Sequence, residues 1–64
     1  MEEETARYYV DIAAQKARQY QNIVKSVNEG YFSYDEVRDL AQRILIEARV
    51  NAATAVLLLE IDYI

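Results

Sequence analysis

The side chains that could do chemistry in this chain are mainly carboxylates, amines and guanidinium groups, because its 64 residues include no His and no Cys. Asp35 and Asp39 lie four residues apart, so on a helix they would share one face. Such a pair could hold a cation, but it also fits the acidic, solvated start of a helix. Without an imidazole or a thiol, the usual general bases, activated nucleophiles and transition-metal ligands are missing. We therefore expect no enzymatic activity, no metal site and no cofactor.

The charge balance argues against nucleic-acid binding. The net charge is −4, whereas proteins that bind nucleic acid usually present a basic patch. The seven basic residues are spread along the chain with acidic residues between them: Arg7, Lys16, Arg18, Lys25, Arg38, Arg43 and Arg49. The sequence therefore predicts a chain that does not bind nucleic acid directly.

The two ends of the chain bear on where it resides. The most apolar stretch, residues 50–64, contains Asn51, Glu60 and Asp62 and is shorter than the roughly 20 residues of a spanning helix. The start, Met1-Glu2-Glu3-Glu4, is the opposite of the basic start of a signal peptide. We expect no transmembrane segment and, if the chain is complete, a cytoplasmic location. A chain excised from a longer protein would not support that expectation.

A single segment carries turn signals, around the only glycine, Gly30. Glycine suits the left-handed conformation that often ends a helix. Ser33 and Glu36 have the spacing of a capping box, in which each side chain bonds the other residue's amide. Phe32 and Val37 occupy the two positions of a hydrophobic staple around the same cap. These local rules agree that one helix ends near Gly30 and another begins after Ser33.

The fold class predicted from this break is all-α. We expect one helix over about residues 3–29, a turn over 30–33 and a second helix over about 34–62, forming one domain. A short connection makes two helices antiparallel neighbours, so the chain should form a two-helix, coiled-coil-like hairpin. A hairpin of this size buries little surface, and it has no disulfide to stabilise it. We therefore expect it to assemble into a helical bundle or a larger oligomer.

Apolar residues at alternating steps of four and three predict the intramolecular seam between the helices. On the first helix the steps begin at Ala6 and end at Tyr31, and on the second they begin at Val37. Asn51 or Ala52, and Leu58 or Leu59, could each fill one position, and Asn51 would either fix the register or be tolerated at the surface. The predicted seam comprises Val10, Ala13, Ala17, Tyr20, Val24, Val27, Ala41, Ile44, Ala48, Ala52 and Ala55.

The second helix carries another apolar row, which we call the outer row. Its members recur at steps of three or four and therefore share a face: Ile46, Val50, Ala53, Leu57, Ile61 and Ile64. At about 100° per residue, Ile46 lies roughly 160° from Ile44. One neighbouring helix cannot cover both faces, so the outer row is predicted to bind a partner.

Two kinds of partner fit the outer row. Closed homodimers are the commonest soluble assemblies, so a second copy of the chain is the first expectation. A different helical protein is the alternative, in which case the chain would act as a small acidic binder or inhibitor. Both interpretations describe a structural or interaction module without catalysis.

The turn and the second helix also resemble the coiled-coil hairpin of TolC-like outer-membrane efflux proteins. The resemblance lies in Gly30-Tyr31-Phe32-Ser33-Tyr34-Asp35-Glu36-Val37, followed by Asp39, Ala41-Gln42-Arg43, Leu45, Glu47-Ala48 and Arg49-Val50-Asn51-Ala52. Tyr31 stands where that family usually has Leu. The resemblance implies a hairpin segment at the tip of a helical barrel, with Gly30, Ser33 and Val37 in the tip that meets an adaptor protein.

Overall fold

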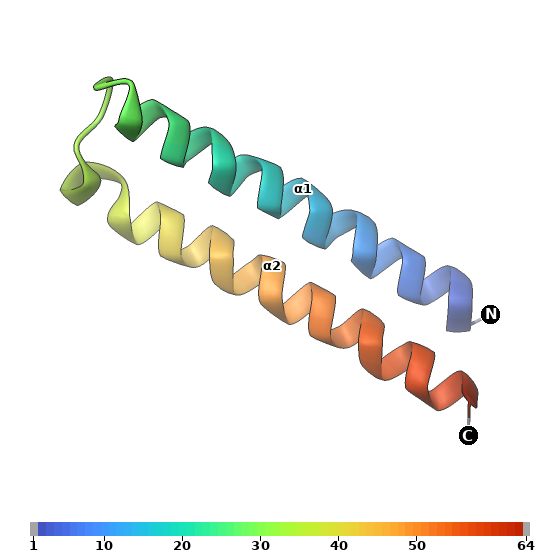
Figure 1. The fold of residues 1–64 in the computed structure, drawn as a ribbon. Coiled ribbons are helices and arrows are strands. Elements are labelled where there is room, and N and C mark those ends of the chain that lie inside the picture. Colours follow the sequence, from blue (N-terminus) through green and yellow to red (C-terminus); the bar gives the residue numbers. More distant parts are fainter. Residues whose placement is uncertain (1, 64) are drawn as a thin grey trace.

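The computed structural model of the chain is an antiparallel hairpin of two long helices (Figure 1). It describes residues 2–63, with side chains described for residues 3–60. Helix α1 spans Glu2–Asn28 and helix α2 spans Tyr34–Tyr63. The hairpin is 48 Å long and 14 by 11 Å across, and its two termini lie together at the end away from the turn (Figure 1). The all-α hairpin predicted from the sequence is confirmed.

The end of α1 is a Schellman motif built around Gly30. Gly30 has a φ of +86°, which is the left-handed region that glycine adopts without steric cost. Its amide donates to the carbonyl of Val27 at 3.0 Å, and the Tyr31 amide donates to the carbonyl of Ser26 at 3.0 Å. These are the two backbone bonds that define the motif. They satisfy carbonyls that the helix leaves unpaired at its end and turn the chain toward α2.

The start of α2 is the predicted capping box. The Ser33 amide donates to Oε1 of Glu36 at 3.0 Å, and the Glu36 amide donates to Oγ of Ser33 at 3.3 Å. Because the Glu36 carboxylate accepts the Ser33 amide and sits near the Ser33 hydroxyl, its pKa lies below the ordinary value. The two ends of the turn are thus fixed by interactions within eleven residues of sequence.

The seam between the helices follows a three-then-four spacing on α1. Lys16, which is not part of the predicted apolar seam, faces α2 there. On α2 the spacing is four then three, and Asn51 and Leu58 take the two positions that were ambiguous. The inward positions, all buried or half-buried, are Ala6, Tyr9, Ala13, Lys16, Tyr20, Ile23 and Val27 on α1, and Val37, Ala41, Ile44, Ala48, Asn51, Ala55 and Leu58 on α2.

Four predicted seam residues are instead exposed. Val10 is 47% exposed and Val24 is 40% exposed, and Ala17 and Ala52 are also exposed. On α1 the prediction was wrong because it placed the next seam residue four positions after Ala6, Ala13 and Tyr20, whereas in the structure it lies three positions after each. On α2 Asn51 takes the inward position that was assigned to Ala52. Lys16 faces α2 in place of Ala17, and its ammonium group pairs with a carboxylate on that helix.

Little of the chain is fully buried. Among the described side chains, only Ala6, Ile44 and Ala55 are buried hydrophobic residues, and no polar side chain is buried. The Asn51 side chain is half-buried in the seam, and its Nδ2 donates to the carbonyl of Glu47 at 2.7 Å within the same helix. Because two of the three core residues are alanines, the seam contributes little hydrophobic stabilisation.

Candidate interaction surface

The acidic side chains do not gather into a metal site within the described part of the chain. Asp39 pairs with Nε of its neighbour Arg38 at 3.9 Å, and Glu36 is engaged in the helix cap. The most extensive feature of the described surface is its exposed apolar side chains. The same described residues include no helix that is long and apolar enough to cross a membrane.

The outer row of α2 lies on the face turned away from α1. Ile46, Val50 and Leu57 are between 58% and 60% exposed, and Ala53 between them is exposed as well. Ile61 and Ile64, the last two predicted members, lie outside the described side chains. On the described part of the row, successive large side chains are one or two helical turns apart. The result is an apolar strip about three turns long that nothing in the hairpin covers.

A second uncovered apolar strip runs along one side of the seam. Its members each follow an inward position by one residue: Val10, Ala17 and Val24 on α1, and Leu45, Ala52 and Leu59 on α2. In an antiparallel helix pair, positions of this kind on the two helices lie on the same side of the seam. We call this strip the open flank. Leu45 is half-buried and the other five residues are exposed.

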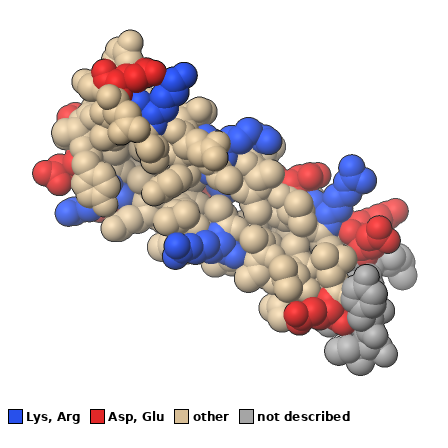
Figure 2. All heavy atoms as spheres, viewed as in Figure 1, with Lys and Arg blue, Asp and Glu red and all other residues tan. Residues whose placement is uncertain are grey.

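The opposite side of the hairpin is more polar. There Nζ of Lys16 lies 2.8 Å from Oε2 of Glu47 and ties the two helices together. Glu47 precedes the seam residue Ala48 by one position, which places it on the side away from the open flank, and Lys16 reaches it from an inward position of α1. Figure 2 shows one broad side of the molecule, on which uncharged side chains form a continuous surface with charged groups mainly around its margins.

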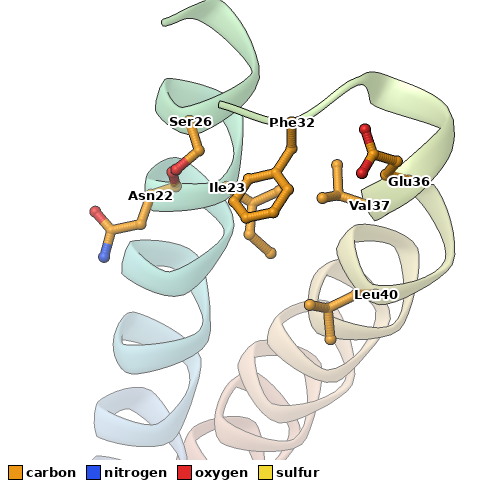
Figure 3. A pocket seen from close by; sticks show the side chains of 7 residues that line it. All are labelled: Asn22, Ile23, Ser26, Phe32, Glu36, Val37 and Leu40. Atoms are coloured by element: carbon orange, nitrogen blue, oxygen red, sulfur yellow. The ribbon is translucent and has the colours of Figure 1, made fainter. Parts of the chain in front are cut away.

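A hollow of about 410 Å³ lies near the turn, between the two helices (Figure 3). Phe32 points from the turn into it, toward Ile23 of α1 and Val37 of α2 (Figure 3). Phe32 and Val37, the predicted staple residues, thus line the same hollow. The Phe32 ring remains half exposed. The hollow lies where the turn packs against the two helices. No unpaired charged side chain points into it.

The accessible surface of the chain is large for its mass. The chain exposes 5196 Å² at a mass of 7.4 kDa. A compact monomer of that mass would expose about 4,200 Å² by the usual scaling of area with mass. The excess of about 1,000 Å² slightly exceeds the roughly 800 Å² that each partner buries in a standard protein interface.

No protein-family model, no curated protein and no solved structure matches this chain. The resemblance to TolC-like efflux proteins is therefore neither supported nor contradicted by these comparisons. It stays a prediction that rests on the residues of the turn and of α2.

Proposed function

We propose that this chain is a non-enzymatic structural module that self-associates through the outer row of α2. The observation that carries the proposal is the exposure of Ile46, Val50 and Leu57 on the face of α2 opposite α1. A contiguous exposed apolar strip on a small protein usually marks an interaction site.

The weakness of the internal seam supports the proposal. Ile44 is the only large residue among the buried core residues of the described chain. Full burial of a Val, Leu or Ile side chain stabilises by about 1.5–3 kcal/mol. Burying three such side chains of the outer row would therefore contribute more than the alanines of the seam can. Association supplies the hydrophobic burial that a lone hairpin of this length lacks.

The partner that we propose is a second copy of the chain. The excess accessible area of about 1,000 Å² is sufficient for one standard interface per chain. A two-fold interface uses the same patch on both subunits, and a strip of Ile, Val, Ala and Leu has no charge of its own that would oppose pairing with itself. The margins carry Arg43 and Glu60, which have opposite signs.

Analytical ultracentrifugation of the purified chain at micromolar concentration tests the proposal. We expect a species larger than the monomer, and we expect Val50→Glu with Leu57→Glu to reduce its mass. The matched control is Gln15→Glu with Asn22→Glu, which adds the same charge at the same spacing on exposed positions of α1 and should leave the mass unchanged.

A well-folded wild-type monomer at that concentration would overturn the proposal. Circular dichroism of each variant distinguishes loss of association from loss of helix. If the wild type is monomeric alone but binds one foreign protein stoichiometrically through the outer row, the chain is a binder of another protein instead.

A further inference from the structure

We infer that the outer row binds the outer row of a second copy in the antiparallel orientation, with Arg43 of each copy paired to Glu60 of the other. The inference rests on the proposed function, and it adds the orientation, the register and the two charged residues that select them. The contacts involve α2 of each copy, because the described outer row lies on the face turned away from α1.

The apolar strip of the outer row is bounded by charges of opposite sign. Arg43 lies three residues before Ile46, and Glu60 lies three residues after Leu57. Both charged residues therefore continue the row on the same face of α2, and both are exposed. Neither forms an ion pair within the part of the chain that the structure describes. The strip thus has a cationic end toward the turn and an anionic end toward the termini.

Opposite charges at the two ends favour the antiparallel orientation. If two α2 helices paired in parallel, Arg43 would meet Arg43 and Glu60 would meet Glu60, and like charges that face each other disfavour an interface. In the antiparallel orientation, each Arg43 meets Glu60 of the other copy, so one interface contains two attractive contacts. The turns of the two hairpins then lie at opposite ends of the dimer.

The residue types also favour one register. Steps of three and four are symmetric about the middle of every step, so the spacing alone does not choose a centre. With the two-fold axis between residues 51 and 52, the charged ends meet, Ile46 faces Leu57, and Val50 faces Ala53. Every charged position of the row over residues 43–60 then faces an opposite charge, and every apolar position faces an apolar residue.

The two neighbouring antiparallel registers lose this match. Moving the axis half a heptad toward the turn places Asp39 opposite Leu57 and Glu36 opposite Glu60. Moving it equally far toward the termini places Val50 opposite Glu60. Each alternative brings a carboxylate against an apolar side chain, where the loss of its hydration has no compensating contact. The register centred between residues 51 and 52 is therefore the one that charge and hydrophobicity both favour.

The charged residues beside the row do not oppose this register. Glu47 and Arg49 flank the row on α2, and both lie level with residues 54–56 of the second copy. That segment carries no charge. The charges that distinguish the two orientations are therefore Arg43 and Glu60 at the ends of the strip.

Charge reversal tests the pairing. Arg43→Glu replaces both attractive contacts of an antiparallel dimer with repulsive ones, and sedimentation equilibrium should show a dissociation constant about tenfold higher, since exposed ion pairs are individually weak. Adding Glu60→Arg exchanges the two charges, and it should return the constant to within about threefold of the wild type. Arg18→Glu makes the same charge change at an exposed position of α1 and should leave the constant nearly unchanged. In a parallel dimer Arg43→Glu would only exchange one repulsive contact for another.

Cysteine cross-linking measures the register independently, because the chain has no Cys of its own. Ile46→Cys and Leu57→Cys would face each other, so mixing the two variants should give a disulfide-linked dimer under mild oxidation. Each variant alone should give little dimer, because its own copies are separated by 11 residues, or about 17 Å along the helix. Leu57→Cys mixed with Gln15→Cys, which is exposed on α1, gives the background.

The outcomes separate this inference from the proposed function. A monomeric wild type, or an association that Val50→Glu with Leu57→Glu does not weaken, would contradict both. If that variant does weaken the association but Arg43→Glu has no more effect than Arg18→Glu, the charged ends do not meet and only the inferred pairing is wrong. Cross-linking of Ile46→Cys to itself would likewise show a parallel dimer and leave the proposed function standing.

Discussion

Nζ of Lys16 lies 2.8 Å from Oε2 of Glu47, and this ion pair joins α1 to α2 near the middle of the hairpin. The side chains are 28% and 40% exposed, so water still screens the attraction. The aliphatic stem of Lys16 occupies an inward position, while its charged end reaches the edge of the seam. The pair therefore contributes to the register of the two helices as well as to their stability.

Reversing one charge of this pair should destabilise the hairpin. With Lys16→Glu, two carboxylates come together, and we expect the free energy of unfolding to fall by about 1 kcal/mol, since partly exposed pairs have small energies. Adding Glu47→Lys should restore most of the loss. Urea unfolding at one fixed protein concentration measures both changes.

Lys25→Glu makes the same charge change at the exposed Lys25–Glu29 pair, where the two charged groups are 3.9 Å apart. It should have a smaller effect than Lys16→Glu. If Glu47→Lys changes the stability of the wild type and of Lys16→Glu by the same amount, the contact has no specific coupling energy.

The Lys16–Glu47 pair lies where the seam of α1 could not be predicted from the sequence. Counting apolar residues favours Ala17 over Lys16 at the seam, because periodicity ranks residues by hydrophobicity alone. The structure instead places Lys16 there, where it pairs with Glu47 on the other helix, 31 residues away. A contact at that separation leaves no periodic signal in either helix. The open flank was therefore mistaken for part of the seam.

The turn could be predicted because its determinants are local. Gly30 needs only its own backbone conformation, and Ser33 and Glu36 bond each other three residues apart. On α2 Ala41, Ile44, Ala48 and Ala55 were also predicted at the seam, whereas Ala52 was chosen there in place of Asn51. The partner of the outer row could not be predicted in the same way, because its contacts lie outside the chain.

Gly30→Ala should lower stability through the backbone alone. A Cβ at this position would meet no heavy atom within 4 Å, so no clash adds to the cost. The φ of +86° is one that L-residues adopt at a cost of roughly 1–2 kcal/mol, and we expect thermal unfolding to show a loss of about that size. Gly30→Asn should lose less, because Asn tolerates the left-handed region better than Ala. Equal stability of Gly30→Ala and the wild type would refute this account of the turn.

The capping box should make the start of α2 sensitive to acid. Hydrogen bonding to Ser33 lowers the pKa of Glu36 in the folded chain, so the folded state favours the ionised carboxylate. Its contribution is present above the unfolded-state pKa and is lost as the pH falls through the folded-state pKa. Between about pH 6 and about pH 3, the wild type should therefore lose more stability than Glu36→Gln.

Glu36→Gln is the informative comparison because Gln can also reach back to the Ser33 amide in a capping box but does not titrate. Every other carboxylate is common to the two proteins. Unfolding midpoints that fall in parallel over this pH range would mean that Glu36 does not contribute to the acid sensitivity.

Ile44 and Ile46 offer the sharpest contrast between the interior of the hairpin and its association surface. They lie two residues apart, yet Ile44 is 8% exposed and Ile46 is 59% exposed. Ile44→Ala removes the largest core side chain and should cost about 2–5 kcal/mol at every protein concentration. Ile46→Ala should cost little in dilute solution and progressively more as concentration rises, because it weakens only the associated state. Thermal unfolding over a hundredfold range of protein concentration measures both effects. If the loss in Ile46→Ala does not depend on concentration, Ile46 is not at an interface between copies.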